Sequence, residues 1–276
     1  MVSMLPTLSE GFTNASVKGS YAVSSIGQGG QAASAMLGVL TFDGNGRVSG
    51  TTMSNLPGAP FGNRVQAQAS VEGTYVVDDN GSGYGSTSTI STQSDGSRLD
   101  TSATLLITKA DRLNGALIAL ELSIMENAAD TRTGALNMVL AIRRPDEGKF
   151  SLASFSGTYG GPGIGQGGLL PSAAIGIGAV NFDGKGRFTA VDVQNLPGTL
   201  FRERRNATFD TENGEYMLDD NGLGMIIAPT GRAPLVVSRA KAVGDVKVAL
   251  EYIFLTNDLH ALTGNLITTT VSKRLP

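Results

Sequence analysis

Apolar and polar residues alternate along much of the chain, most regularly between Val65 and Glu72, where valine and alanine alternate with glutamine, serine and glutamate. A period of two is the pattern of a strand that buries one face. Similar runs predict eight strands in the first half of the chain, at residues 17–26, 35–43, 47–55, 65–78, 83–91, 99–109, 115–126 and 134–144. No long stretch has a helical period, although residues 1–8 could form one turn.

Short glycine-containing segments separate these runs, including Asp43-Gly44-Asn45-Gly46, Asp79-Asn80-Gly81, Asp95-Gly96 and Asn114-Gly115. Asn-Gly and Asp-Gly pairs readily adopt the positive φ angles that tight hairpins require. Short antiparallel strands joined in this way favour closure into a barrel, because closure removes the exposed edges of a sheet.

The second half of the chain repeats the first, and the repeating unit has the size of a domain. The matched segments are Ile26–Gly30 with Ile164–Gly168, Phe42–Arg47 with Phe182–Arg187, Asn55–Gly58 with Asn195–Gly198, Asp78–Gly81 with Asp219–Gly222, and Leu120-Glu121 with Leu250-Glu251. We therefore predict an all-β protein with two tandem eight-stranded antiparallel β-barrels. The expected boundaries are residues 1–145 for the first barrel, 146–153 for a linker and 154–276 for the second barrel.

Several predicted strands carry bulky residues on one face and small or neutral residues on the other. The bulky sets are Ile118, Leu120, Leu122 and Ile124, and then Leu136, Met138, Leu140 and Ile142. In a small barrel we expect the bulky face to fill the lumen. The opposite face is too apolar for a well-solvated exterior, which suggests that the barrels pack on each other or on another chain.

Composition narrows the chemistry that is available to the protein. The net charge of −3 gives no electrostatic footprint for nucleic acid. With 0 Cys and 1 His, disulfides, zinc–thiolate sites and histidine cages are excluded. No cofactor-binding motif is present, so we expect no cofactor.

The ends and the hydropathy of the chain bear on its location. There is no run of 18 or more apolar residues, so no membrane span is expected. Residues 1–9 lack the pattern of a signal peptide. We expect a cytoplasmic protein, or an exported one if a signal peptide has been removed.

The run GSYA…GVLTFDGNGRVSG…VEGTYVVDDNGSG resembles a pattern found in bacterial proteins with a lipocalin-like or allene oxide cyclase-like barrel, and GTYG…GAVNFDGKGRF…GEYMLDDNGLG repeats it more weakly. Barrels of these families hold a hydrophobic molecule in the lumen, and several direct a ring closure or an isomerisation without a cofactor. The resemblance implies the same fold and a small-molecule ligand. Its motifs consist mainly of turn glycines, so it assigns no catalytic residue.

Two of the repeated motifs resemble known ligand loops but fit turns better. Phe-Asp-Gly-x-Gly-Arg joins two predicted strands rather than a strand and a helix, which favours a hairpin turn over a phosphate-binding loop. Asp78-Asp79-Asn80-Gly81 lacks the spacing and the final glutamate of an EF-hand, which favours a turn over a calcium site.

Two other shared stretches leave a binding role open. Gln28 and Gln166 lie among glycines that could allow a ligand to approach the backbone at a barrel mouth, or that could form a bulge or turn. Arg64 and Arg204 follow an aromatic residue in each repeat, and each could orient an anionic ligand or cover a turn.

Glu121 and Glu251 occupy the same position in the two repeats. A carboxyl group inside an apolar lumen would have a raised pKa and could act as a general acid or base. Glu251 shares its strand face with Asp245 and Lys247, however, which favours an outward position.

Tyr252 and Phe254 replace Leu122 and Ile124 of the first repeat. They predict either a phenol and an aromatic wall in the second lumen or simple core packing.

The leading functional hypothesis is a cofactor-free cyclase or isomerase that holds an apolar small molecule, a secondary metabolite, in a barrel lumen. Its candidate catalytic residues are Glu251, Tyr252 and Glu121, and its candidate ligand-binding residues are Phe254, Arg204, Arg64, Gln166 and Gln28. The alternatives are a hydrophobic-ligand carrier without turnover and an exported structural module whose barrels are filled. A homo-oligomer formed through the barrel exteriors is a further expectation.

Overall fold

The computed structural model describes residues 11–28, 33–57, 64–79, 81–128, 136–167, 172–197, 203–260 and 264–276. Within these ranges the chain forms strands, tight turns and two short 3₁₀ helices, η1 (Asn14–Val17) and η2 (Leu152–Ser154). The turn expected for residues 1–8 lies outside the described residues.

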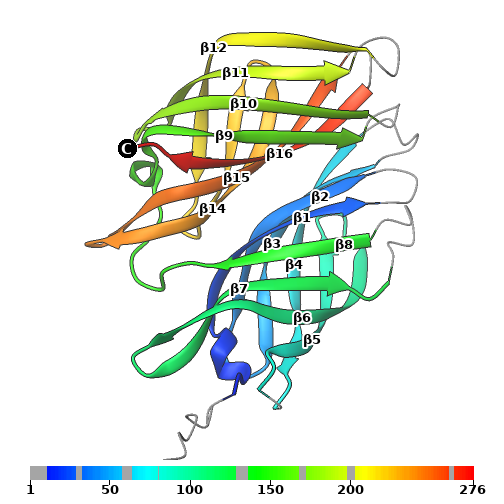
Figure 1. Ribbon diagram of the computed structural model, residues 1–276, viewed down its shortest axis with the longest axis vertical. Helices are drawn as coiled ribbons and strands as arrows, with labels where there is room; N and C mark the ends of the chain where they lie inside the picture. Colours follow the sequence, from blue (N-terminus) through cyan, green and yellow to red (C-terminus); the bar gives the residue numbers. More distant parts are fainter. Residues whose placement is uncertain are drawn as a thin grey trace, which may run out of the picture.

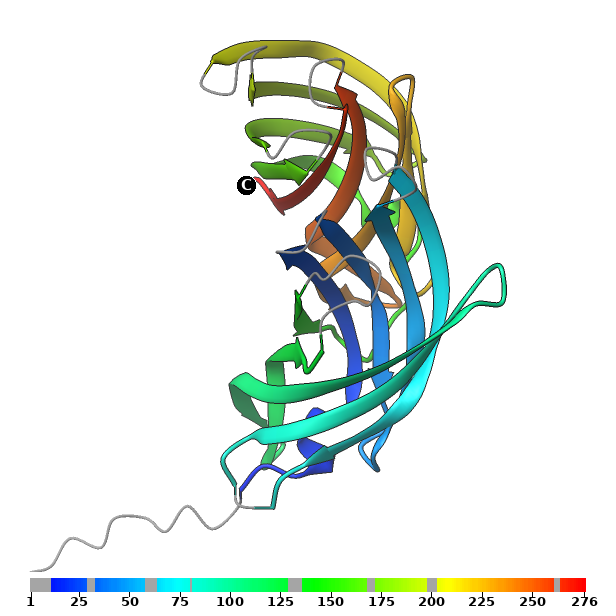
Figure 2. The ribbon, with the colours of Figure 1, turned by 90° about the vertical axis from the view of Figure 1, so that its right-hand side faces the viewer.

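The strands form two closed antiparallel barrels in sequence order (Figures 1 and 2). The first barrel consists of β1 (Gly19–Gln28), β2 (Ser34–Phe42), β3 (Arg47–Pro57), β4 (Arg64–Val77), β5 (Tyr84–Gln93), β6 (Arg98–Leu113), β7 (Ala116–Glu126) and β8 (Leu136–Arg143). The second consists of β9 (Ser156–Gly167), β10 (Ser172–Asp183), β11 (Arg187–Pro197), β12 (Arg204–Leu218), β13 (Leu223–Ala228), β14 (Gly231–Val243), β15 (Val246–His260) and β16 (Gly264–Arg274).

Each barrel closes by pairing its first strand with its last. β1 pairs with both β2 and β8, and β9 pairs with both β10 and β16. The predicted fold class, two tandem eight-stranded antiparallel barrels from an internal duplication, is therefore confirmed.

The repeated Phe-Asp-Gly-x-Gly-Arg motif forms the hairpin between the second and third strands of each barrel. Asp43 Oδ1 accepts hydrogen bonds from the backbone N–H groups of Asn45 at 2.7 Å and Arg47 at 2.9 Å. Gly44 and Gly46 have φ angles of 83° and 102°, which a residue with a Cβ atom rarely adopts. Asp183 makes the same two bonds in the second barrel, so the predicted hairpin turn is confirmed.

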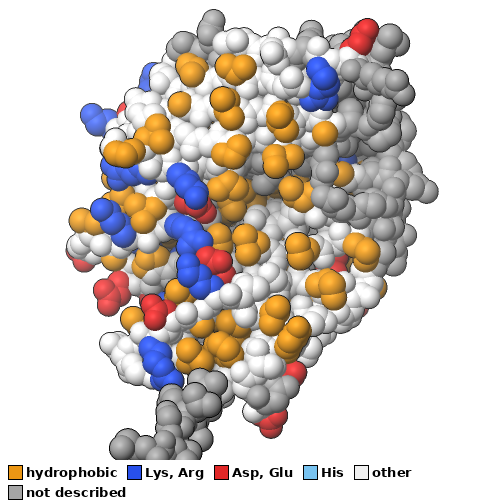
Figure 3. Space-filling view, viewed as in Figure 1, with side chains coloured by type: hydrophobic (Ala, Val, Ile, Leu, Met, Phe, Trp, Pro, Cys, Tyr) orange, Lys and Arg blue, Asp and Glu red, His pale blue; other side chains and the backbone are white. Residues whose placement is uncertain are grey.

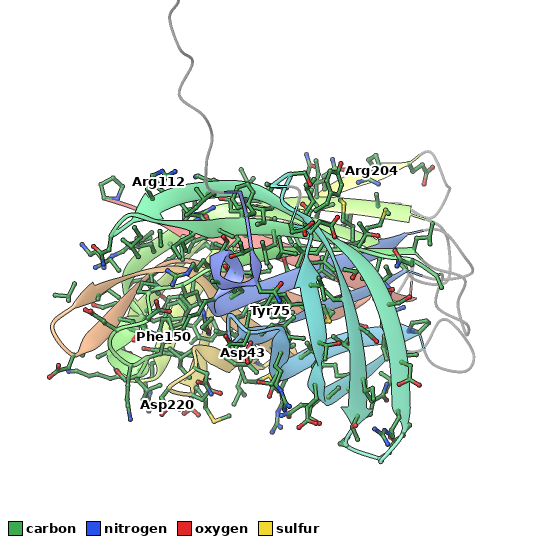
Figure 4. All side chains as sticks on the ribbon, turned by 90° about the horizontal axis from the view of Figure 1, so that it is seen from below. Asp43, Tyr75, Arg112, Phe150, Arg204 and Asp220 are labelled. Carbon is green, nitrogen blue, oxygen red and sulfur yellow. The ribbon has the colours of Figure 1, made fainter. Side chains whose placement is uncertain are left out.

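A 3₁₀ helix closes one end of each barrel. Tyr75 on β4 donates a hydrogen bond of 3.0 Å to the carbonyl of Asn14 in η1, and the buried side chain of Val17 enters the core. Figure 4 shows Tyr75 and Asp43 at this end of the first barrel, which we call its floor. In the second barrel Tyr216 donates in the same way to the carbonyl of Leu152 in η2, at 2.9 Å.

The segment between the barrels belongs in part to the second barrel. The strands of the first barrel end at Arg143 and those of the second begin at Ser156. Phe150 nevertheless lies in the core cluster of the second barrel, and the backbone of Lys149 bridges to Val246. The expected linker, residues 146–153, thus includes a core residue.

The expectation that the bulky face of β8 fills the lumen is wrong. Leu136, Met138 and Leu140 face outward and are exposed, whereas Val139 and Ala141 pack in the core of the first barrel. The interior of an eight-stranded barrel is narrow, so smaller residues fit the inner face of a strand such as β8 that lines the cavity.

The face predicted for β7 is also wrong in part, because β-bulges interrupt its pairing with β6. The register shifts between Ile107 and Ala110, and Ala119 and Leu122 both face the core while Leu120 does not. The second barrel has the same shift between Val237 and Ala240. A bulge adds one residue to a strand and reverses its alternation beyond that point.

The two barrels pack on each other through an apolar cluster that the strands of both supply. Its buried members are Ala22, Ala35, Leu37 and Val39 from β1 and β2, together with Leu223, Val236, Ile253 and Leu255 from β13 to β15. In Figure 1 β1 and β2 lie directly below β14 to β16. We call this contact the barrel junction.

Candidate functional site: the lumen of the first barrel

The lumen of the first barrel contains a cavity of about 150 Å³. Its lining residues come from all eight strands of the barrel. They are Ser25, Ser34, Ala35, Met36, Leu40, Phe42, Val48, Thr52, Ser54, Leu56, Ala69, Val71, Thr87, Thr89, Ser91, Gln93, Leu99, Thr101, Ala103, Ile124, Glu126, Asn137 and Val139. A cavity of this volume is large enough to hold a molecule of about the size of benzene.

The lining changes from apolar to polar along the barrel axis. Phe42 and Val48 lie at the floor, at the ends of β2 and β3 next to η1, and Val71 and Ile124 continue the apolar wall. Toward the opposite end, which we call the mouth, serine and threonine hydroxyl groups dominate the lining. The mouth lies at the right in Figure 1, where β1 ends and β8 begins.

A carboxylate and an amide form the polar group at the mouth. Asn137, near the start of β8, donates a hydrogen bond of 2.7 Å from Nδ2 to Oε2 of Glu126, the last residue of β7. Ser34 Oγ lies 3.4 Å from Asn137 Oδ1. Both Glu126 and Asn137 line the cavity, so a ligand with a hydroxyl or amino group could donate to this carboxylate.

The second barrel carries aromatic side chains where the first has aliphatic ones. In sequence Phe155, Phe188, Tyr252 and Phe254 take the places of Val17, Val48, Leu122 and Ile124. All four belong to, or pack against, the core cluster of the second barrel. Its floor half is therefore filled by rings, whereas the corresponding part of the first lumen borders the cavity.

Tyr252 lies at the centre of this aromatic core. Its ring centroid is 5.2 Å from that of Phe155, 5.5 Å from that of Tyr159 and 6.0 Å from that of Phe254. The side chain is fully buried, and its hydroxyl, which faces Ser272, makes no hydrogen bond of good geometry. Burial raises the pKa of this phenol above its usual value. Of the two alternatives for Tyr252 and Phe254, the geometry matches core packing.

Glu121 and Glu251 point away from the lumens and meet at the barrel junction. Arg239 Nη2 donates a hydrogen bond of 2.6 Å to Glu121 Oε1, and its Nε lies 3.7 Å from Glu251 Oε1. Ser238 Oγ donates to the same oxygen of Glu251 at 2.9 Å. Neither carboxylate lines the cavity, so neither is placed to exchange a proton with a molecule inside it.

Arg64 and Arg204 hold the backbone at equivalent positions of the two barrels. Arg64 donates from Nε to Asn55 Oδ1 at 2.8 Å and from Nη2 to the Asn55 carbonyl at 2.9 Å. Arg204 binds Asn195 in the same way, at 2.6 and 2.8 Å, and is labelled in Figure 4. Burial lowers the pKa of Arg64 to about 10. Each guanidinium group thus fixes the third strand to the fourth and does not line the cavity.

Gln28 and Gln166 lie at the mouth ends of β1 and β9. Their side chains lie outside the described part of the structure, so their contact with a ligand stays a prediction. Phe61 and Phe201, the aromatic residues that precede Arg64 and Arg204, also lie outside it.

Glu126 was missed as a site residue, although the sequence contains a signal for it. It continues the inward face of Leu122 and Ile124 at the same spacing of two residues. A comparison of the two repeats does not select this position, because its equivalent in the second repeat is Thr256 and not a carboxylate.

We also searched the described residues for metal sites and membrane-spanning helices. No group of three acidic or histidine side chains comes together there as metal ligands. In the same ranges, no helix has the length and apolar character needed to cross a membrane. The chain matches no known family model and no curated protein.

Proposed function

We propose that the first barrel binds a compact apolar molecule that carries one hydroxyl or amino group. The observation that carries this proposal is the graded cavity, with Phe42 and Val48 at its floor and Glu126 and Asn137 at its mouth. An apolar pocket with a few converging polar groups is the usual form of a small-molecule site. The resemblance of the turn motifs to lipocalin-like and allene oxide cyclase-like barrels agrees with this function.

The polar group at the mouth selects among ligands. Glu126 supplies acceptor oxygens and, as a carboxylate, repels an acidic ligand. We therefore expect benzyl alcohol and benzylamine to bind more tightly than benzoate, which has the same ring and a negative charge. Isothermal titration calorimetry or ligand-observed NMR measures the three affinities.

A double variant tests whether these ligands occupy the lumen. Val48→Phe with Ile124→Phe imports the residues of the second barrel into the cavity and should weaken binding by at least about tenfold. The matched control is Val76→Phe, because Val76 lies on β4 and faces outward. Equal affinity in the double variant and the control would contradict the proposal, as would the absence of binding by all three ligands.

Turnover of the ligand is a separate proposal that uses the same cavity. A cofactor-free cyclase or isomerase would need a proton-transferring group beside the ligand, and Glu126 is the carboxylate that lines this cavity. Its substrate would be a small phenolic precursor that fits this cavity, and its product would have the same mass. Activity that survives Glu126→Gln would contradict this role, and binding without any product would leave the carrier function.

A further inference from the structure

An apolar patch covers the outer face of β9, β10 and β11 in the second barrel. Its exposed residues are Ile164, Ile175, Ile177, Val191 and Val193. Ile175 lies directly opposite Ile164, and Ile177 lies directly opposite Val193, so the side chains form one continuous surface. Figure 3 shows apolar side chains spread over this upper part of the molecule. We call it the β10 patch.

The β10 patch is the repeat equivalent of a surface that the first barrel buries. By the alignment of the repeats, Ile175, Ile177 and Val193 correspond to Ala35, Leu37 and Met53. Those three residues form or adjoin the apolar cluster of the barrel junction. The contrast is large at one position, because Leu37 is 0% exposed and Ile177 is 68% exposed.

The surface of the second barrel that covers Leu37 has an exposed equivalent on the first barrel. Leu37 packs in one cluster with Val236 and Leu255 of the second barrel, and Val271 adjoins them. Their counterparts in the first barrel are Leu106, Met125 and Leu140. Met125 and Leu140 are exposed, and Met138, opposite Met125, extends the apolar surface. We call this surface the β7 face.

The junction inside the chain joins two different faces of the repeat. It pairs the first and second strands of one barrel with the sixth and seventh strands of the other. The barrels also share a direction, since β1 and β9 point to the same side in Figure 1. A contact of this heterologous kind leaves one complementary face open at each end of the pair, and its repetition forms rings or open filaments.

We infer that a second copy of this chain docks its β7 face on the β10 patch, repeating between chains the junction that already exists within one. The equivalents of these two faces already pack together in each molecule, at the barrel junction. A lipid surface fits the patch less well, because β9 and β10 contain no lysine or arginine and β11 contains only Arg187, at its start.

Two single variants and their mixture test the inference by sedimentation velocity. The wild type should form a series of dimers, trimers and larger species as its concentration rises from the micromolar to the millimolar range. Ile177→Asp removes the β10 patch and Met125→Asp removes the β7 face, and each should weaken self-association by at least about tenfold. The control Val76→Asp changes an exposed residue on β4, outside both faces, and should associate like the wild type.

The mixture distinguishes this head-to-tail contact from other modes of association. Each single variant keeps one working face, so an equal mixture should form a discrete dimer and nothing larger. Self-association of Met125→Asp equal to that of the wild type would overturn the inference, since it indicates a patch-to-patch dimer. A wild type that stays monomeric throughout would also overturn it, and so would binding to phosphatidylcholine vesicles that Ile177→Asp abolishes while the wild type forms no oligomers.

Discussion

Arg239 and Glu121 are joined across the barrel junction by a hydrogen bond of 2.6 Å from Nη2 to Oε1. The same guanidinium group lies 3.7 Å from the buried Glu251, which belongs to the second barrel, as Arg239 does. One cation thus serves a carboxylate from each repeat. Lys109, the first-barrel counterpart of Arg239, lies 3.8 Å from Glu121.

We expect Arg239→Met to lower the free energy of unfolding by about 1–3 kcal/mol. The substitution removes the guanidinium group that pairs with Glu121 and lies nearest to the buried carboxylate of Glu251. Lys109→Met is the matched control, since its exposed ammonium group lies in solvent, and should change stability by no more than about 0.5 kcal/mol. Urea unfolding followed by circular dichroism measures both. Equal effects of the two substitutions would show that the junction does not depend on Arg239.

The buried tyrosines should respond differently to loss of the hydroxyl group. Tyr159 donates a hydrogen bond of 2.9 Å to the Ala249 carbonyl, so Tyr159→Phe should destabilise the protein by about 1 kcal/mol. Tyr252→Phe removes a buried hydroxyl without a well-formed bond and should leave stability unchanged or raise it slightly. Thermal unfolding of both variants provides the comparison, and a larger loss in Tyr252→Phe would contradict the packing described for its hydroxyl.

Glu126 should determine which ligand charge the cavity prefers. Glu126→Gln keeps the shape of the mouth but removes the charge, so the preference for benzylamine over benzoate should shrink by about tenfold or more. Affinity for benzyl alcohol should change less, because the amide oxygen still accepts a hydrogen bond. A matched substitution, Glu72→Gln on β4, changes an exposed carboxylate outside the cavity lining and should leave all three affinities intact. Unaltered selectivity in Glu126→Gln would place the ligand elsewhere.

The two hairpin aspartates should contribute to acid sensitivity. Asp43 and Asp183 each accept hydrogen bonds from backbone N–H groups, and these bonds hold the pKa of each carboxyl below its ordinary value of 3.8. A folded-state pKa below the unfolded value adds stability above that value, which is lost as the pH falls through the folded pKa. The melting temperature of Asp43→Asn with Asp183→Asn should therefore fall less than that of the wild type between about pH 5 and about pH 2. The double control Asp100→Asn with Asp245→Asn changes the net charge equally and should follow the wild type.

The repeat and the strand order could be read from the sequence because turn chemistry is local. Asp43, Gly44 and Gly46 and their copies satisfy the same backbone requirements wherever the hairpin lies, so the motif survives in both halves. The alternation in β4 is equally direct, since no bulge interrupts its pairing with β3 or β5.

The candidate site could not be predicted so well, because it depends on contacts between strands. The bulges opposite Glu121 and Glu251 follow from how two strands pair, and no residue type in the sequence marks them. Whether a barrel keeps a cavity depends on the sum of several side-chain volumes around its lumen. The difference between Leu122 and Tyr252 can be read from the sequence, but the aromatic packing that surrounds Tyr252 depends on rings from other strands.

The unlike faces of the barrel junction have a consequence for the origin of the duplication. A single barrel that carried both faces would leave one face of each copy open in a pair joined by this contact. Fusion of two genes halves the number of open faces per barrel but does not remove them. After such a fusion the two repeats can diverge in their interiors: aromatic rings pack the floor of the second barrel, while the described residues of the first barrel enclose a cavity.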